Sequence, residues 1–199
     1  MSSNGSGGPQ KGKVIVISGP SGTGKTSICN ELLNRLPGAV WSVSATTRPP
    51  RGDEADGSAY EFIRPEEFDR REQAGDFLET AEYVGHRYGT PAGPVRQAVE
   101  AGHHVIMEIE VQGGLQVARR MPESVRIFVL PPDMESLKAR LAGRRTESEE
   151  IMKRRLAKAD GEIAFARDSG MYTYFVINDV LDDTVEEILE IVRREMETE

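Results

Sequence analysis

Residues 19–26 read Gly-Pro-Ser-Gly-Thr-Gly-Lys-Thr and match the pattern G-x-x-x-x-G-K-[ST]. The residues before this stretch, Lys13–Ser18 (KVIVIS), form a short β-branched run that is typical of a buried parallel strand. The residues after it, Thr26–Leu36, carry apolar side chains at helical spacing until Pro37-Gly38 ends the helix. A strand, a glycine-rich turn and a helix in this order predict a loop that binds phosphate.

Each residue type in this loop has a physical reason. Glycines let backbone N–H groups approach phosphate oxygens, and the helix N-terminus adds partial positive charge. Lys25 can reach the β- and γ-phosphates of a nucleoside triphosphate, and the Thr26 hydroxyl can ligate Mg²⁺. The predicted triphosphate site comprises Gly19, Pro20, Ser21, Gly22, Thr23, Gly24, Lys25, Thr26 and Ser27.

The rest of the chain alternates between predicted strands and helices, with one interruption. After a second strand over Ala39–Ser44 comes a polar, turn-rich stretch, Thr46–Ser58, which is too long for a simple connector. Strands over Tyr60–Ile63 and Phe77–Val84 follow, with a short helix after Pro65 between them. The remaining elements are helices over Pro91–Ala101, Gln112–Met121, Asp133–Leu141 and Asp183–Met196, a long helix ending near Arg167, and strands over His103–Ile109, Ser124–Leu130 and Tyr174–Ile177.

Strands that alternate with helices favour a parallel sheet that is covered on both faces. We predict a single α/β domain over residues 12–199, with a P-loop NTPase-type parallel sheet flanked by helices over residues 12–44 and 91–199. A mixed α/β lobe is inserted at residues 45–90, and a helical lid lies at about residues 140–158. Residues 1–11 are rich in Ser and Gly without an apolar run, so we expect a disordered tail rather than an export signal.

Composition limits the classes of partner. The 199 residues include 25 Lys and Arg against 33 Asp and Glu, and the resulting charge of −8 disfavours broad binding to nucleic acid. The longest apolar runs fall far short of the ~20 residues that span a bilayer. The single cysteine, Cys29, has no partner for an internal disulfide, which favours a reducing compartment. We expect a cytoplasmic protein without nucleic-acid or membrane partners, and the oligomeric state stays open.

A second group of cations lies in the turn-rich stretch. Arg48 and Arg51 are three residues apart, and the two prolines between them stiffen the segment. Two guanidinium groups held in this way suit a phosphate group. Beside a loop that binds a triphosphate, they predict the acceptor site of a phosphoryl transfer.

Several stretches together resemble the guanylate kinase family over nearly the whole chain. In the order of the family they are GPSGTGKT, SVSATTRPPR followed by EADGSAYEF, FLETAEYVGHRYGTP, MEIEVQGG, RLAGRRTESEE and FVIND. The resemblance implies transfer of the γ-phosphoryl group of ATP to GMP, giving ADP and GDP in purine nucleotide metabolism, with Mg²⁺ as cofactor. It leaves open whether dGMP is accepted.

The resemblance also implies roles for individual residues. The acceptor phosphate is assigned to positions that match Arg48, Arg51, Tyr60 and Tyr88, and the guanine base to positions that match Ser44, Glu79, Thr90 and Glu110. A carboxylate such as Glu79 can accept from guanine N1–H and N2–H₂, whereas adenine lacks both donors and would leave it unpaired. The acceptor is therefore expected to be a guanine nucleotide.

On the donor side, the resemblance assigns Arg144 and Arg155 to the triphosphate, Arg140 and Asn178 to the neighbourhood of adenine, and Glu108 to a water bound to Mg²⁺. The expected catalytic residues are Lys25, Arg48, Arg144 and Arg155. The chain departs from the usual family pattern at two places. Glu110 stands where Asp is common, and Arg51-Gly-Asp-Glu54 replaces R-x-G-E.

Other functions fit parts of the sequence. Guanylate-kinase-like domains also serve as catalytically silent protein-binding modules, although the intact Gly24-Lys25-Thr26 argues against this reading. A P-loop kinase of another phosphorylated acceptor would keep the loop, but Glu79 and Ser44 favour guanine. A P-loop switch GTPase is disfavoured because the chain lacks an N-K-x-D run.

Overall fold

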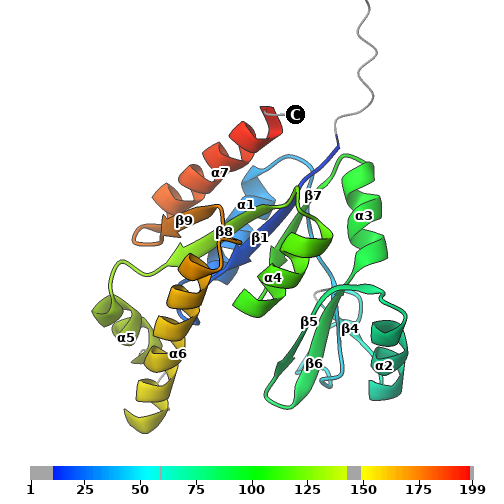
Figure 1. The fold of residues 1–199 in the computed structure, drawn as a ribbon, viewed down its shortest axis with the longest axis horizontal. Helices are drawn as coiled ribbons and strands as arrows, with labels where there is room; N and C mark the ends of the chain where they lie inside the picture. The colour runs from blue at the N-terminus through cyan, green and yellow to red at the C-terminus, as the bar shows by residue number, and fades with distance from the viewer. Residues whose placement is uncertain (1–10, 59, 143–148, 198–199) are drawn as a thin grey trace, which may run out of the picture.

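The computed structural model describes residues 11–58, 60–142 and 149–197. Its strands form two sheets, one of five strands in the order β2-β7-β1-β8-β9 and one of four in the order β4-β3-β6-β5 (Figure 1). The predicted α/β fold, with a parallel sheet flanked by helices, is confirmed. Of the predicted disordered tail, residues 1–10 lie outside the described residues.

All paired strands of the larger sheet run parallel. The central strand, β1, is buried at every residue, as expected for a strand covered on both faces. It is also the strand that leads into the glycine-rich loop. The five strands are β1 (Val14–Ser18), β2 (Ala39–Trp41), β7 (His104–Glu108), β8 (Val125–Leu130) and β9 (Tyr174–Ile177).

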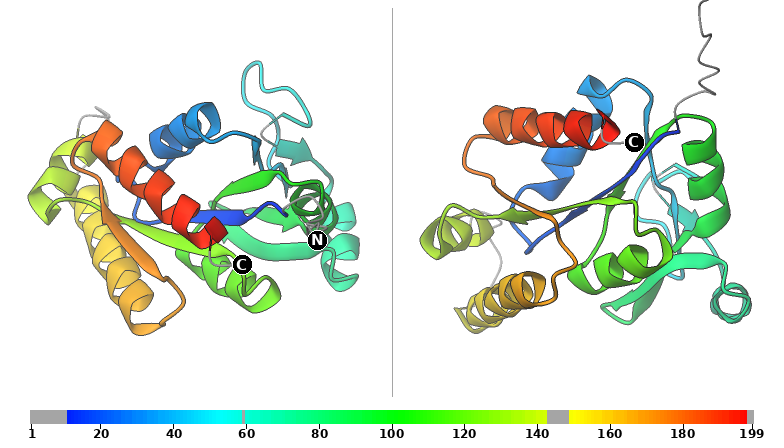
Figure 2. Two further views of the ribbon diagram at one scale, coloured as in Figure 1. Left: turned by 90° about the horizontal axis from the view of Figure 1, so that it is seen from above. Right: turned by 45° about the horizontal axis from the view of Figure 1, so that its top comes forward.

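Alternation along β1 divides the core into two layers. Ile15 and Ile17 pack with α1 and α7 on one face, whereas Val14 and Val16 pack with α3 and α4 on the other. Seen from above, the sheet separates α1 and α7 from α4 and α6 (Figure 2). These helices are α1 (Lys25–Arg35), α3 (Ala92–Glu100), α4 (Val111–Arg120), α6 (Glu149–Asp168) and α7 (Leu181–Glu197).

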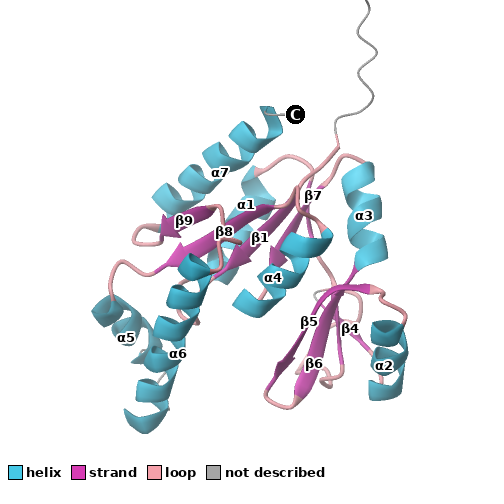
Figure 3. Ribbon diagram, in the orientation of Figure 1, coloured by secondary structure: helices cyan, strands magenta, loops and turns pink. Residues whose placement is uncertain are grey.

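The smaller sheet is mixed and has a small core of its own. Strand β3 pairs parallel with β4 and antiparallel with β6, which pairs antiparallel with β5 (Figure 3). Phe68 of α2 stacks on Phe77 with 4.7 Å between ring centroids, and Ala45 completes this core. The elements are β3 (Ser44–Thr46), β4 (Tyr60–Phe62), α2 (Pro65–Gln73), β5 (Phe77–Tyr83) and β6 (His86–Pro91).

The range predicted as a helical lid, about residues 140–158, covers the end of α5 (Met134–Ala142) and the first half of α6, and its role as a lid stays a prediction. The two helices pack through Leu137, Leu141 and Ala159. Residues 143–148 between them lie outside the described residues. Among the helices that are described, none is both long and apolar enough to cross a membrane.

Two expectations about strands were wrong. The single strand predicted over Ala39–Ser44 covers β2 and only the first residue of β3, which belongs to the other sheet, because pairing with β7 ends after Ser42, whose N–H donates to the Ile106 carbonyl at 3.0 Å. Strand β6 was not predicted, and its sequence contains Gly89 and Pro91, two residue types that are unfavourable in strands. A Cβ at Gly89 would lie 2.9 Å from Phe77 Cδ1, so the absence of a side chain lets the small core close over this strand.

Candidate active site

The loop between β1 and α1 closes around the ammonium group of Lys25. Lys25 Nζ donates to the Gly19 carbonyl at 2.8 Å and to the Pro20 carbonyl at 3.1 Å. The Thr23 hydroxyl also donates to Pro20, at 2.9 Å. Backbone oxygens of the loop therefore hold the ammonium group of Lys25 on the inner side of the turn. A cation in this position is suited to bind an anion.

A brace from the far end of the chain supports the loop. Asn178 Nδ2 donates to the Thr23 carbonyl at 2.7 Å, and Asn178 Oδ1 accepts from the Thr184 hydroxyl at 3.1 Å. Gly24, at the start of α1, has φ of 86°, and a Cβ there would lie 2.5 Å from Asn178 Nδ2. The buried Asn178 thus holds the loop backbone, while its predicted contact with adenine stays a prediction.

Thr26 and Glu108 bring two oxygen ligands together beside the loop. Thr26 Oγ1, in the first turn of α1, donates to Glu108 Oε1 at the end of β7, and the two atoms are 3.1 Å apart. Hydroxyl and carboxylate oxygens suit Mg²⁺, which takes further ligands from phosphates and water. The two residues therefore fit a magnesium ion that arrives with a nucleotide.

Three carboxylates influence the loop lysine through their charge. Burial lowers the pKa of Lys25, and Glu108, Glu110 and Glu162 oppose that shift by raising it. Their negative charge keeps the ammonium form available despite its partial burial. A polyanion that binds here consequently meets both a cation and nearby acidic groups.

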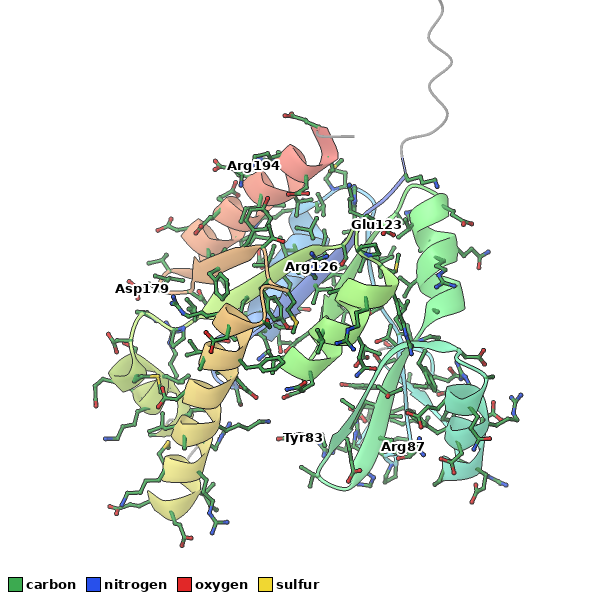
Figure 4. All side chains as sticks on the ribbon, viewed as in Figure 1. Tyr83, Arg87, Glu123, Arg126, Asp179 and Arg194 are labelled. Carbon is green, nitrogen blue, oxygen red and sulfur yellow. The ribbon has the colours of Figure 1, made fainter. Side chains whose placement is uncertain are left out.

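The predicted lid arginines lie at different places. Arg155 NH2 of α6 donates to Ser21 Oγ at 2.7 Å, which brings this guanidinium to the phosphate loop. Arg140 NH2 lies 3.5 Å from the carbonyl of Asp179, a residue labelled in Figure 4. Arg144 lies outside the described residues, so its role stays a prediction.

Arg48 is the central cation of the lobe, with a side chain that is only 5% exposed. Its NH1 and NH2 donate to Glu54 Oε2 and Oε1 at 2.9 and 3.1 Å, and NH1 also donates to the Pro49 carbonyl at 2.8 Å. The rings of Tyr60 and Phe62 lie 5.3 and 5.5 Å from its Cζ. Hydrogen bonding to Glu54 raises the pKa of Arg48, so the group stays cationic.

Glu54 is a site residue that sequence reasoning missed. Besides the fork of Arg48, it accepts the backbone N–H of Arg51 at 2.7 Å. These hydrogen bonds lower the pKa of Glu54 and fix the turn that presents both arginines. Its position three residues after Arg51, in a stretch stiffened by prolines, was the available signal.

Two predicted tyrosines meet beside Arg48. The rings of Tyr60 and Tyr88 lie edge to face with 5.9 Å between centroids. Burial raises the pKa of Tyr60, and a hydrogen bond with Tyr88 contributes to the raised pKa of Arg48. Arg48 and the two phenols are thus brought together, with the exposed side chain of Arg51 on the adjoining turn.

Three of the four residues predicted to bind guanine, Ser44, Glu79 and Thr90, form a row across three strands of the lobe. Thr90 Oγ1 donates to Glu79 Oε1 at 2.7 Å, and the Ser44 and Thr90 hydroxyls are 3.2 Å apart. Burial raises the pKa of Glu79, which is 3% exposed. A Cβ at Gly113 would lie 2.7 Å from Glu79 Oε2, so this glycine lets α4 approach the carboxylate.

Glu110 is not part of this row. It stands at the N-terminal cap of α4, with a side chain that is 48% exposed. Its Oε2 accepts from Lys158 Nζ of α6 at 3.2 Å. Sequence reasoning also missed Lys158, although its spacing from Arg155 and Glu162 predicts a shared face of the helix.

Comparison with known proteins decides the family, because residues 11–195 match the family model described as guanylate kinase. The chain belongs to the guanylate kinase family. It is 47% identical over 184 residues to the guanylate kinase of Desulfitobacterium hafniense (strain Y51), which covers 92% of this chain and 90% of that protein. It is 48% identical over 185 residues to the guanylate kinase of Rubrobacter xylanophilus, and that match covers 93% of this chain and 95% of the relative.

A solved guanylate kinase has the same fold. The crystal structure of guanylate kinase from Anaplasma phagocytophilum matches with a TM-score of 0.73 and 33% identity, and the match covers 94% of this chain and 87% of that one. The predicted membership of the guanylate kinase family is therefore confirmed. The roles of the individual residues rest on the geometry above and stay predictions.

Proposed function

We propose that the protein transfers the γ-phosphoryl group of ATP to GMP, giving ADP and GDP. One observation carries the proposal: a phosphate loop closed around Lys25 occurs together with a lobe that holds a cation, Arg48, and a buried, hydrogen-bonded carboxylate, Glu79. Relatives that are guanylate kinases, at 47% and 48% identity, support the same reaction.

On the donor side, phosphoryl transfer needs positioning and cations more than a covalent nucleophile. In the proposed mechanism, Lys25 exchanges the carbonyls of Gly19 and Pro20 for oxygens of the triphosphate. Arg155 likewise exchanges its contact with the Ser21 hydroxyl, and Arg144 is proposed as a further cation. Mg²⁺, held by Thr26 and through water by Glu108, would neutralise charge on the phosphates when bound.

On the acceptor side, Arg48 keeps donors for a phosphate. A guanidinium has five N–H donors; Glu54 and the Pro49 carbonyl take three of them and Tyr88 bonds to the group as well, so one donor is left and a phosphate could replace Tyr88 as a partner. Tyr60, Tyr88 and the side chain of Arg51 would add further donors, which suits a doubly charged monophosphate. This arrangement would aim one acceptor oxygen at the γ-phosphate.

Glu79 would select the base. Its ionised carboxylate can accept both N1–H and N2–H₂ of guanine, and these hydrogen bonds offset the burial that raises its pKa. Ser44 and Thr90 contribute hydroxyls at the same row, and Glu110 is proposed to meet the 2-amino group. Adenine would leave a buried carboxylate unpaired, which is strongly unfavourable.

We further propose that the reaction serves purine nucleotide metabolism in the cytoplasm, with neither nucleic acid nor membrane as partner. The single cysteine, Cys29, is buried and has no second cysteine in the chain to pair with, which supports a reducing compartment. The net charge of −8 supports small anionic substrates at local cationic sites over nucleic acid.

An acceptor screen tests the proposal. ADP release from ATP is measured with GMP, dGMP, AMP, CMP, UMP and a sugar phosphate in turn. We expect saturable release with GMP and a value of kcat/KM for AMP at least about 10²-fold lower. Equal values for AMP and GMP would contradict the base-reading role, and binding of GMP without ADP release would instead indicate the silent protein-binding module.

A further inference from the structure

Lys158 joins three parts of the molecule that are far apart in sequence. Its Nζ lies 3.2 Å from Glu110 Oε2 at the cap of α4 and 3.3 Å from Glu162 Oε1 on its own helix, α6. It also lies 5.8 Å from the centroid of the Tyr83 ring, at the end of β5 in the lobe. One cation therefore contacts the main domain and the lobe from α6.

Glu162 forms an ion pair with Lys158 within α6. The two residues are four positions apart on α6, and the side chain of Glu162 is only 11% exposed, compared with 58% for Lys158. The largely buried carboxylate of Glu162 thus holds the ammonium group of Lys158 from the same helix, while that ammonium group also reaches Glu110. Attraction to Glu110 and Glu162 raises the pKa of Lys158 against the opposing effect of burial.

The hairpin that carries Tyr83 is short and well defined. Tyr83 pairs with His86 across a turn in which Val84 and Gly85 have φ of 51° and 73°. Two consecutive positive φ values belong to the tight hairpin turn that fixes the register of its strands. In Figure 4 the labelled Tyr83 extends from this hairpin towards α6.

The contact also matters for charge. Glu108, Glu110 and Glu162 all raise the pKa of Lys25 against the effect of burial, so their negative charge acts at the loop that is proposed to bind the triphosphate. Lys158 neutralises two of these carboxylates directly. Without it, Glu110 would add repulsion against the acceptor.

We propose that Lys158 is a positioning residue for the acceptor, which holds Oε2 of Glu110 so that Oε1 can accept the guanine amino group, and which ties this carboxylate to the Tyr83 hairpin. The proposal rests on the proposed function and deepens it. It assigns part of the recognition of GMP to α6, outside the lobe. It also gives the longer Glu110, in place of the family's common Asp, a reason to be there: its extra methylene lets it reach Lys158.

The test compares Lys158→Met with Lys158→Arg in steady-state assays with ATP and GMP. Lys158→Met keeps the length of the side chain and removes its charge. We expect it to raise KM for GMP about threefold to fivefold, the range of a partly exposed ion pair, with KM for ATP within about twofold. Lys158→Arg keeps the positive charge, and we expect its KM for GMP to stay within about twofold of the wild-type value.

A double-mutant cycle makes the test specific for Glu110. Glu110→Asp shortens the side chain by one methylene, so the carboxylate no longer reaches Lys158. In that background Lys158→Met is expected to change KM for GMP by less than about twofold. Lys11→Met removes an exposed lysine ahead of β1 and is the matched control, expected to leave both KM values unchanged.

Four results would overturn the proposal. Lys158→Met raising KM for ATP as much as KM for GMP would make it a general charge effect. If the fold-change in KM for GMP of the double variant equalled the product of the fold-changes of Lys158→Met and Glu110→Asp, the two residues would act separately. An active wild type with an unchanged Lys158→Met variant would reject the positioning role alone, whereas a wild type without GMP-dependent ADP release would reject the proposed function as well.

Discussion

The phosphate loop and the acceptor lobe are both proposed to bind phosphate, but they are built differently. In the loop, backbone carbonyls of Gly19 and Pro20 hold Lys25, and a strand that is fully buried lies directly behind. In the lobe, a side chain, Glu54, holds Arg48, and the core beneath is small. A cation held by backbone is specified by local sequence, whereas a cation held by another side chain depends on how a long turn folds.

The largest expected effect separates the chemistry of the loop from acceptor binding. Lys25→Met removes the charge that faces the transferring phosphoryl group, so kcat is expected to fall about 10³-fold. The affinity for GMP, measured by calorimetric titration, should stay within about twofold because the lobe holds its cation independently. A large loss of GMP affinity would mean that the two regions do not act separately.

The next effect tests the side-chain row of the lobe. Glu79→Gln replaces one acceptor oxygen by a donor, and kcat/KM for GMP is expected to fall about 10²-fold while the preference over AMP shrinks. Glu82→Gln, on an exposed position of the same strand, is the control and should change little. A preference for GMP that survives Glu79→Gln would remove this carboxylate from base recognition.

The same residue predicts a dependence on pH. Burial raises the pKa of Glu79 above its ordinary value of 4.5, so protonation begins at a higher pH than for an exposed glutamate. The protonated form cannot accept both guanine donors, and KM for GMP should therefore rise as the pH falls through that raised pKa. Initial rates across the acid range, with Glu79→Gln as the variant that lacks the dependence, check the direction.

A smaller effect probes the backbone of the loop. Gly24→Ala adds strain at φ of 86° and displaces Asn178, which then loses its hydrogen bond to Thr23. Gly75→Ala, at φ of 74° with open space around it, measures the strain alone. Chemical denaturation should show that Gly24→Ala costs about 1 kcal/mol more than Gly75→Ala. Equal losses would mean that the brace from Asn178 contributes nothing.

The smallest effect concerns the anion inside the lobe. Glu54→Gln removes the charge that orients Arg48 and weakens the hydrogen bond from the backbone N–H of Arg51 to residue 54. KM for GMP should therefore rise about fivefold with KM for ATP unchanged. Asp53→Asn, a change of the same charge at an exposed neighbour, is the control. A lower KM for GMP in Glu54→Gln would show that Glu54 competes with the acceptor phosphate instead of positioning its partner.

This difference in construction explains what the sequence predicts. The loop, β1 and α1 were predicted because glycine spacing, a β-branched run and helical periodicity are local signals. The row of Ser44, Glu79 and Thr90 came only from resemblance to a family, since its members lie on three strands that meet through the lobe's own sheet. No periodicity in one segment predicts that meeting.

The missed features have the same physical origin. Strand β6 contains Gly89 and Pro91, which give no local signal of a strand, yet Gly89 is needed beneath the ring of Phe77. Glu54 and Lys158 act through partners that only the folded turn and the packing of α6 bring near. Both are charged residues on exposed segments, where sequence alone gives solvated ion pairs as the ordinary expectation.

The most direct measurement is the stoichiometry of the products. ATP and GMP are incubated with the wild-type protein and Mg²⁺, and ADP and GDP are quantified over time by ion-exchange chromatography. If the γ-phosphoryl group of ATP is transferred directly to GMP, ADP and GDP form in equal amounts. We expect little ADP when GMP is left out. ADP formed at the same rate without GMP, or without matching GDP, would contradict the account.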